Sequence, residues 1–384
     1  MSDRTLYDPS RITNHPDFKL LPQGDKPDKD RRDLNYSLMY DADHVNKYCV
    51  RPRLDPAPGQ VEVHVKATGI CGSRIRSDVH FATHGNIGDM KVTQPCSCGH
   101  ESAGVVTRIG EGVENFSIGE KVALENGIGC GQCIPCKKGV YNSCEIDCFF
   151  STPPFHGTMT RYHLHPAEWL HKLPDSVSYE EGALCEPLTV SMAAVARSGL
   201  RLGDVCLVAG AGPIGLVTLL SVRAAGGIPI ITDLSQGRLD FAKKLVPNAR
   251  TVLIEKGVSQ QDVAQKIKAA AGNPITVAIE CTGVESSIGS TIYSMAFGGK
   301  VFVTGVGKEI QSYPMMHCSA NEISLDFQYR YANQYPRSIR LVAEGYIDLK
   351  PLVTHRFDLE DAMDAMNTAA DPRSGAIKVQ VLDN

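Results

Sequence analysis

The chain has 384 residues, more than the roughly 100 to 200 of a typical domain, so we expect two domains or one domain with a large insertion. Its formal net charge of −4 offers no basic field for nucleic acid or an anionic membrane, which leaves small molecules as the expected partners. Thirteen cysteines and a polar N-terminus without the apolar core of a secretory signal favour a reducing compartment, and we expect the cytoplasm.

The first part of the chain divides into a polar leader and a β-rich region. Residues 1–33 are rich in Asp, Lys, Arg and Pro and too polar to repay the entropy of ordering, so we expect a loose leader. Residues 60–70 alternate apolar and polar side chains as a half-buried strand does, and residues 100–113 and 119–124 repeat this pattern between Gly-rich turns. This region is predicted to be mainly β.

From about residue 189 short apolar runs alternate with amphipathic segments. The apolar runs and the helix-like segments between them lie at 205–209, 215–225, 228–232, 238–245, 276–280 and 300–305. Such alternation is typical of βαβ units, and it predicts an α/β domain with a parallel sheet. The charge-free run 205–222 approaches the length of a membrane span, but GAGPIG in its centre favours a strand, a turn and a helix.

A nucleotide-binding motif lies in this second region. The three glycines of GAGPIG, which opens a helical pattern, allow a tight turn, close approach of a pyrophosphate and close helix packing, and Pro213 suits a first helical position. Asp233 ends the next apolar run, where a carboxylate accepts hydrogen bonds from the adenosine ribose and repels a 2′-phosphate. Arg238 is the one nearby residue that would suit NADP, but we expect it to lie along the adenine, the alternative being a solvated helix residue. The pattern predicts a dinucleotide site and favours NAD. The glycines are Gly210, Gly212 and Gly215.

Four cysteines follow the spacing C-x2-C-x2-C-x7-C in a loop that also holds Gly and Pro. Four thiolates at this spacing suit a tetrahedral structural zinc. An iron–sulfur cluster is the rival, since C-x2-C-x2-C also begins ferredoxin motifs, but the fourth cysteine comes late and no Pro follows it. Free thiols that cluster by chance are the third interpretation, and Cys148 is expected to be a spare thiol. The four cysteines are Cys130, Cys133, Cys136 and Cys144.

A second set of candidate metal ligands is dispersed along the chain. Cys71 follows the strand-like segment 60–70, His100 and Glu101 lie in GHESAG, and Glu186 lies in CEPL. A zinc held by three protein ligands keeps one position open, and an alcohol bound there loses its proton near neutral pH. Each residue alone has an ordinary explanation as a turn histidine or a helix cap. Only their combination with the dinucleotide motif indicates a catalytic site.

In these motifs the chain resembles the zinc-dependent medium-chain alcohol and polyol dehydrogenases. The match runs from about Asn35 to the C-terminus through GICGS, GHESAG, the four cysteines, CEPL, GAGPIGL, TDLSQGRLDFAKK and QYRYANQYPRSIRLV. This order is similar to the branch of sorbitol, xylitol and L-arabinitol dehydrogenases, and the chain looks most like the fungal L-arabinitol 4-dehydrogenases.

The resemblance implies an α/β fold in which a GroES-like, β-rich catalytic domain is interrupted by a Rossmann-type, doubly wound parallel-sheet domain, assembled as a homotetramer. We therefore expect the leader at 1–33, the catalytic domain at 34–188 and 329–384 with a structural-zinc lobe at about 126–148, and the NAD-binding domain at 189–328.

The resemblance also implies roles for single residues. One catalytic zinc per chain would be held by Cys71, His100 and Glu101 with Glu186 beside it, and one structural zinc by the four cysteines. The His-Glu pair separates polyol enzymes from relatives that use His and a second Cys. The residues implied to touch NAD are Pro213, Ile214, Asp233, Arg238, Thr304, Gln328, Tyr329 and Arg330. Arg330 and Tyr331 are also implied to face the polyol hydroxyls.

The stretch CGSRIRSDVH departs from the family pattern Cys-Gly-Ser-Asp-x-His by four extra residues, 74–77. If the segment is helical, four residues add about 400° of turn and roughly 6 Å of rise, so His80 keeps its face but moves one turn away. If the extra residues loop out, SDVH occupies the usual place. In both cases Ser73 or Ser77, together with His80, is expected to pass the substrate proton outward.

A second departure is the sequence QPCSC before GHE. In a strand Cys98 and His100 share a face, so Cys98 is a candidate substitute ligand, and the alternative is a small buried side chain. Two functions remain. The first is an NAD-dependent zinc enzyme that oxidises a secondary hydroxyl of a pentitol or hexitol. The second is a cofactor-binding pseudoenzyme whose catalytic zinc site the insertion has disabled.

Overall fold

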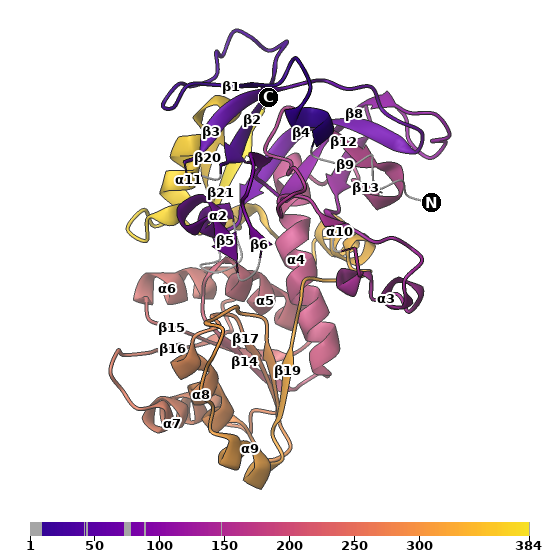
Figure 1. Ribbon diagram of the computed structural model, residues 1–384. Coiled ribbons are helices and arrows are strands. Elements are labelled where there is room, and N and C mark those ends of the chain that lie inside the picture. Colours follow the sequence, from indigo (N-terminus) through magenta and orange to yellow (C-terminus); the bar gives the residue numbers. More distant parts are fainter. Residues whose placement is uncertain are drawn as a thin grey trace. The chain divides into compact units, whose positions relative to one another are not determined.

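The computed structural model describes residues 10–41, 43, 45–72, 78–87, 90–146 and 148–383. These residues form two compact units (Figure 1). Unit 1 falls within Met1–Glu186, Tyr335–Ala343 and Leu349–Asn384, and unit 2 within Pro187–Gln334 and Glu344–Asp348. The first division falls inside one continuous helix, α4 (Tyr179–Ser198), and the short segment 344–348, expected in the catalytic domain, clusters with unit 2.

The main sheet of unit 1 has seven strands. Their order is β13 (Leu170–Lys172), β9 (Lys121–Leu124), β8 (Glu101–Ile109), β4 (Gln60–Ile70), β21 (Lys378–Leu382) and β20 (Val353–Asp358), and β12 (Tyr162–Pro166) also pairs with β4. The strand β4 pairs antiparallel with both β8 and β21, which sets Gly69 opposite Glu101 and Ile70 opposite Val379. The last strand of the chain therefore lies beside the strand that leads into Cys71.

A second, four-stranded sheet and several short elements complete unit 1. The sheet has the order β1 (Lys19–Leu20), β3 (Lys47–Arg51), β2 (Asn35–Tyr40) and β7 (Cys96–Ser97), and two short pairs are β5 (Asn86–Ile87) with β6 (Met90–Lys91) and β10 (Gly127–Ile128) with β11 (Cys148–Phe149). The helices are α1 (Ser10–Thr13), α2 (Asp78–His84), α3 (Ile134–Lys137), α10 (Tyr335–Ala343) and α11 (Ala362–Ala370), with 3-10 turns at Tyr141–Ser143, Ala167–Trp169, Lys350–Leu352 and Leu359–Asp361.

Residues 10–33 differ from the loose leader that their composition predicted. The strand β1 adds an edge to the second sheet, and Leu21 donates its backbone N–H to Tyr48 O at 2.8 Å. Lys26 Nζ lies 2.7 Å from carboxylate oxygens of both Asp361 and Asp364. Exposed ion pairs of this kind contribute little by themselves, so the backbone pairing and the packing of Leu21 on the core matter more. These partners lie far away in sequence, where composition gives no hint of them.

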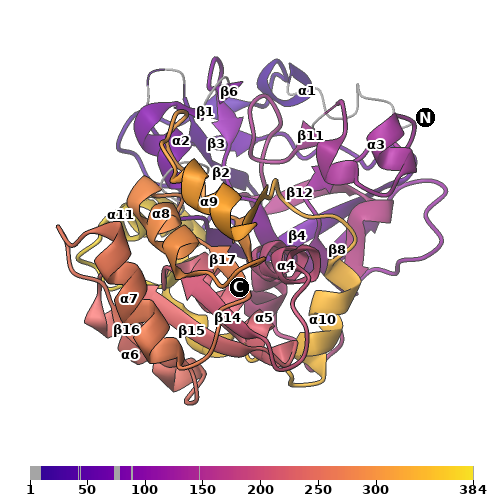
Figure 2. The ribbon, with the colours of Figure 1, turned by 90° about the horizontal axis from the view of Figure 1, so that it is seen from below.

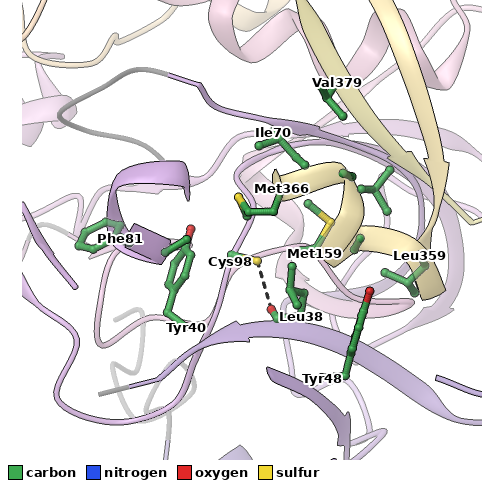
Figure 3. Packing of buried hydrophobic residues seen from close by; sticks show 14 of the residues in the cluster. Leu38, Tyr40, Tyr48, Ile70, Phe81, Cys98, Met159, Leu359, Met366 and Val379 are labelled. Atoms are coloured by element: carbon green, nitrogen blue, oxygen red, sulfur yellow. Dashed lines mark hydrogen bonds between the residues drawn. The ribbon is translucent and has the colours of Figure 1, made fainter. Parts of the chain in front are cut away.

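The hydrophobic core of unit 1 joins segments from the start, the middle and the end of the chain (Figure 3). Leu38 and Tyr48 from the second sheet pack with Ile70 from β4, Phe81 from α2 and Met366 from α11. Burying a side chain of this size stabilises the fold by roughly 1.5 to 3 kcal/mol. The cluster thereby fixes the end of β4 and the helix α2, which flank Cys71 on its two sides in the sequence.

Unit 2 is a six-stranded parallel sheet with helices between the strands. The strand order is β16 (Arg250–Leu253), β15 (Ile228–Asp233), β14 (Val205–Ala209), β17 (Val277–Glu280), β18 (Lys300–Val303) and β19 (Ser324–Phe327). The helices are α5 (Pro213–Ala224), α6 (Gln236–Leu245), α7 (Gln260–Ala271), α8 (Glu285–Ser294) and α9 (Met315–Asn321). The order reverses between β14 and β17, as in dinucleotide-binding folds. The predicted parallel sheet is confirmed, and α7, α8 and α9 lie side by side (Figure 2).

The run 205–222 forms β14, a turn and most of α5, as its GAGPIG sequence predicts. Throughout the described part of the chain, no helix combines the length and the apolar character that crossing a bilayer requires.

Candidate metal centres and dinucleotide site

Cys71, His100 and Glu101 come together at the edge where β4 ends and β8 begins. One ligand atom from each of the three lies within 4.8 Å of the others. The register of the two strands explains this, because Gly69 stands opposite Glu101 and Cys71 follows two residues later. A thiolate, an imidazole and a carboxylate are a donor set that zinc accepts, and three protein ligands leave a fourth position open. The three residues therefore fit a catalytic zinc.

Asp78 is the residue that ties this cluster together, although the sequence assigned it no role. Its carboxylate is fully buried at the start of α2 and accepts hydrogen bonds from Tyr40 Oη (2.6 Å), Cys71 N (3.1 Å) and Gly99 N (3.0 Å). His100 Nδ1 lies 3.4 Å from the same carboxylate. A carboxylate on the second nitrogen of a ligand histidine fixes the ring and its tautomer. Asp78 is therefore positioned to orient His100.

The charges of Asp78 and His100 shift the pKa values of both groups. Burial raises the pKa of Asp78, but the charge and hydrogen bond of His100 outweigh it and bring the pKa well below the usual range. Burial lowers the pKa of His100, and the charge of Asp78 outweighs it, so that this pKa is raised. The pair therefore keeps a carboxylate directed at the imidazole.

The position of Asp78 bears on the four extra residues of CGSRIRSDVH. Asp78, the second residue of SDVH, lies beside the metal cluster, because its side chain accepts a hydrogen bond from Cys71 N at 3.1 Å. His80 lies within α2, and its ring stacks on that of His84 with centroids 4.3 Å apart. Ser73 and Ser77 lie outside the described residues.

Lys378 is a second partner that sequence reasoning missed. Its Nζ lies 2.8 and 2.7 Å from the two oxygens of Glu101 and also donates to Ile70 O at 3.2 Å, while its side chain is 3% exposed. Burial lowers the pKa of Lys378, but the charge of Glu101, and to a smaller degree that of Glu186, outweigh it and raise the pKa. The lysine remains charged and balances one negative charge of the ligand set.

Glu186 does not form a solvated cap, which is the ordinary role of a glutamate before proline. It lies inside α4, next to Pro187, and is 6% exposed. Its charge acts on Lys378, so it belongs to the same electrostatic environment as Glu101.

Cys98 is not a fourth ligand in this geometry. The residues 98–100 are not in a strand, because β7 ends at Ser97, β8 begins at Glu101 and Gly99 has a φ of +90°. The Cys98 thiol is fully buried in the apolar core, where its Sγ donates to Leu38 O at 3.2 Å (Figure 3). The alternative of a small buried side chain describes it.

The four cysteines of the lobe form a compact thiol cluster. Their Sγ atoms all lie within 4.8 Å of one another, with 4.0 Å between Cys130 and Cys136 and 3.9 Å between Cys133 and Cys144. Four sulfurs about 2.3 Å from one tetrahedral metal are about 3.8 Å apart, so the spacing fits a single zinc. An iron–sulfur cluster would hold its ligands farther apart, because several iron atoms lie between them.

Backbone N–H groups near the four cysteines favour the thiolate form, which is the form that binds a metal. The N–H groups of Cys133 and Gln132 point at Cys130 Sγ and lower the pKa of this thiol to about 6. Gly129 packs so closely that a Cβ there would lie 3.2 Å from Cys136 Sγ and 2.9 Å from Tyr141 Cβ. Cys148 stands apart in β11 and packs in a small apolar cluster with Ile128 and Phe150.

The glycine turn of unit 2 has the geometry that a pyrophosphate needs. Gly210 has a φ of +98°, and a Cβ on Gly215 would lie 1.7 Å from Gly210 O, so α5 packs on β14 only without a side chain there. A Cβ on Gly212 would meet no atom within 4 Å, which leaves open space at the N-terminus of α5. Backbone N–H groups at such a helix start bind phosphate groups. Pro213 occupies the first turn of α5, followed by Ile214.

Asp233 ends β15, as predicted. Its carboxylate accepts hydrogen bonds from Ala211 N and Ser235 N, both at 2.8 Å, so it braces the glycine turn. Arg238 lies in the first turn of α6, where its backbone N–H is capped by Ser235 Oγ.

The remaining predicted cofactor and substrate residues cluster at the carboxyl ends of β18 and β19. Thr304 follows β18, and its Oγ1 has no hydrogen-bond partner among the described residues. Gln328 follows β19 and donates through Nε2 to Val190 O at 2.6 Å. Arg330 has a φ of +51°, and its guanidinium lies 4.6 Å from the centre of the Tyr329 ring. Tyr331, predicted to face the substrate, is 3% exposed.

Comparison with known proteins identifies the family. Residues 57–175 match the family described as alcohol dehydrogenase GroES-like domain, and residues 213–344 match the zinc-binding dehydrogenase family. The chain is 54% identical to L-arabinitol 4-dehydrogenase of Aspergillus niger over 337 residues, 85% of this chain and 86% of the relative. It is 41% identical to sorbitol dehydrogenase of Bos taurus over 319 residues, 83% of this chain and 88% of the relative.

A solved structure leads to the same fold. A protein described as a short chain alcohol dehydrogenase of Escherichia coli CFT073, complexed with NADH, superposes with a TM-score of 0.81 over 91% of this chain and 100% of its own at 26% identity. The expected GroES-like and Rossmann-type fold is confirmed, and nothing supports the pseudoenzyme. The chain therefore belongs to the zinc-dependent medium-chain alcohol and polyol dehydrogenase family, an enzyme class that uses zinc and a nicotinamide cofactor.

Proposed function

We propose that this enzyme oxidises a secondary hydroxyl of a pentitol or hexitol, of the L-arabinitol, xylitol or sorbitol type, to the ketose with NAD. The observation that carries the proposal is the cluster of Cys71, His100 and Glu101, together with the hydrogen bond from Cys71 N to the Asp78 carboxylate. The names of the relatives, L-arabinitol 4-dehydrogenase and sorbitol dehydrogenase, support the substrate class.

In the proposed mechanism one zinc would be held by Cys71, His100 and Glu101, with Glu186 beside it. When bound, zinc would supply a Lewis acid that lowers the pKa of a substrate hydroxyl, and NAD would be the hydride acceptor. Asp78 holds the His100 ring in one orientation, and Lys378 balances the charge of Glu101.

The proton has a proposed route away from the substrate. Ser73 or Ser77 receives the proton of the hydroxyl and His80 carries it outward, as in the family pattern. A positioned histidine in such a role contributes about 10² to 10⁴ in rate. Deleting residues 74–77 gives the family sequence CGSDVH, and we expect kcat to rise with little change in zinc content. A deletion variant that folds, keeps both zinc ions and turns polyols over no faster would argue against this relay.

The cofactor preference is proposed from Asp233. A carboxylate at the end of β15 repels a 2′-phosphate, and the exposed Leu234 beside it offers no cation. The unmodified enzyme should therefore prefer NAD. Replacing Asp233 with Ser and Leu234 with Arg should shift the preference towards NADP. Equal use of both cofactors by the unmodified protein would contradict the proposal.

We propose a homotetramer in the cytoplasm, with two zinc ions per chain and no nucleic-acid or membrane partner. Unit 2 exposes an edge strand, β19, and large apolar side chains that include Met315, Met316 and Phe327. Unpaired strand edges and exposed apolar side chains are features of interfaces. Light scattering after size-exclusion chromatography measures the assembly, and a monomer at micromolar concentration would contradict it.

The experiment that tests the function is a panel of L-arabinitol, xylitol, sorbitol and ribitol, each with NAD and with NADP. The readout is kcat/KM for each pair, together with zinc content by elemental analysis. Activity on at least one polyol with NAD, lost in Cys71→Ser while the lobe zinc remains, is the expected result. Zinc in the four-cysteine lobe alone, with no turnover on any polyol, would refute it.

A further inference from the structure

A small cavity in unit 1 lies between α1, the end of β3 and the strand β12, and none of its lining residues belongs to the sites described above. The cavity has a volume of about 60 Å3. A buried water needs roughly 10 to 15 Å3, so several waters or one small polyatomic ion fit. The side chains around it give the cavity an unusual electrostatic character.

Arg51 is the main source of the positive charge at this cavity. This residue is 6% exposed, and its Nη1 donates only to neutral oxygens, Ser97 Oγ at 3.4 Å and Gly157 O at 3.3 Å. Its Nε has no acceptor among the described residues, and no carboxylate of the described chain forms an ion pair with it. Burial lowers the pKa of Arg51 to about 10, so it keeps its charge at neutral pH. A buried guanidinium without a counter-charge is costly.

Among the described residues a single carboxylate, that of Glu62, lines the cavity, and it is already neutralised. Glu62 accepts two hydrogen bonds from Arg53, at 2.9 and 2.7 Å, and a further one from Arg108. Arg108 also pairs with Asp55 at 2.6 Å. Two carboxylates thus balance two arginines in this network. The charge of Arg51 remains uncompensated.

Two buried histidines complete the lining. His163 is 3% exposed, and neither ring nitrogen has a hydrogen-bond partner among the described residues. Burial, then the neighbouring His165 and Arg51, bring its pKa well below the usual value, so the ring is neutral and one nitrogen carries a hydrogen to donate. His156, which also lines the cavity, accepts from Ser97 N through Nδ1 at 3.1 Å.

We propose that this cavity binds a small oxyanion of the size of inorganic phosphate, held by Arg51 together with the ring N–H group of His163. A guanidinium matches the geometry of two oxygens of such an anion, and charge-assisted hydrogen bonds of this kind are strong. The anion supplies Arg51 with the counter-charge, and Arg51 Nε and His163 with the acceptors, that the described residues do not provide. The site stabilises unit 1, and it is independent of the proposed polyol oxidation.

The test uses the full-length, zinc-loaded enzyme dialysed into a buffer without oxyanions. Saturating NAD fills the dinucleotide site, which would otherwise bind phosphate. Thermal unfolding is then followed with sodium phosphate, and separately sodium sulfate, against sodium chloride of equal ionic strength. We expect Tm to rise by about 2 °C for each tenfold increase in phosphate above its dissociation constant. Calorimetric titration with phosphate should give one site per chain.

Matched variants locate the site. Arg51→Met should abolish the rise in Tm with phosphate and should unfold in chloride at a temperature no lower than the unmodified enzyme, because it removes an uncompensated buried charge. His163→Phe should weaken phosphate binding at least tenfold, and it keeps the test valid if the first variant fails to fold. Arg356→Met is the control, since Arg356 pairs with Glu180 at 2.7 Å outside the cavity, and it should keep the full phosphate response.

Three results would overturn the proposal. The first is a Tm that responds equally to phosphate, sulfate and chloride. The second is a phosphate response that persists in both Arg51→Met and His163→Phe. The third is a response that appears only after residues 1–9 are removed, because a carboxylate of the chain itself would then be the occupant. A larger rise with one of the two oxyanions supports the proposal and identifies the preferred anion.

Discussion

Replacing Asp78 with Asn tests the idea that this carboxylate organises the catalytic metal site. The substitution keeps the shape of the side chain and removes its charge. In the structure one carboxylate oxygen accepts from Tyr40 Oη, Ser151 Oγ and Gly99 N, and the other accepts from Cys71 N. An amide has only one acceptor oxygen, so its NH2 group must face one of these donors.

The magnitude follows from those contacts. At least one hydrogen bond to a charged group is lost, at roughly 1.5 to 3 kcal/mol, and one buried donor is left unsatisfied, at roughly 1 to 3 kcal/mol. We therefore expect the free energy of unfolding to fall by about 2.5 to 6 kcal/mol. His100 also loses the carboxylate that orients it, and such changes lower metal affinity about 10- to 100-fold.

The assay is competition for zinc against a chelator of known affinity, read by elemental analysis, together with urea unfolding. Tyr40→Phe removes one hydrogen bond of 2.6 Å and keeps the charge, so it should lower stability by about 1 to 2 kcal/mol with little loss of zinc affinity. The matched control is Asp358→Asn, whose carboxylate is exposed and pairs with Lys29, and its stability should change by less than about 1 kcal/mol.

A clear result would refute this reasoning. If Asp78→Asn folds with wild-type stability and holds the catalytic zinc as tightly as the unmodified enzyme, then neither the charge of Asp78 nor its contact with His100 matters for the metal site. A loss of lobe zinc in place of catalytic zinc would also contradict it.

Three further predictions concern other parts of the chain. Cys133→Ser should remove one zinc per chain and lower stability by several kcal/mol, since metal binding is coupled to folding; unchanged zinc by elemental analysis would contradict this. Gly215→Ala should weaken NAD binding at least about tenfold, as measured by fluorescence titration, because the new Cβ would lie 1.7 Å from Gly210 O and must displace the turn. Burial raises the pKa of Glu62, but hydrogen bonds from Arg53 and other donors outweigh burial and lower this pKa from its usual value of 4.5 to about 2. The Glu62 carboxylate therefore stabilises the fold fully at pH values above 4.5, and this stabilisation is lost as the pH falls through about 2. Glu62→Gln should therefore cost up to about 3 kcal/mol at pH 7, less where solvent screens Arg53, and should flatten the acid unfolding curve between about pH 4.5 and 2; an unchanged curve would disprove the assignment.

The sequence alone was sufficient wherever the chemistry is local. The glycine turn, the carboxylate that follows it and the four-cysteine spacing are short patterns whose geometry depends on neighbouring residues. The structure has a tight turn at Gly210 to Gly215, the Asp233 carboxylate bonded to it, and four thiols within 4.8 Å of one another. The parallel sheet of unit 2 was also predictable, because strands and helices alternate along the chain and each apolar run is long enough to identify. The resemblance to a family added the dispersed ligands Cys71, His100 and Glu101, which no local pattern links.

Only the tertiary structure decided the partners that come from far along the chain. Lys378 meets Glu101 across 277 residues because β21 pairs with β4, and nothing in the sequence IKVQV signals a buried ion pair. The leader packs because β1 pairs with β3 and its lysines meet carboxylates near the C-terminus. Cys98 is buried because the segment before GHE leaves the sheet. Arg51 has no counter-charge among the described residues for the same reason. Charges and contacts depend on which strands become neighbours, and that is fixed by the whole fold and not by any single stretch of residues.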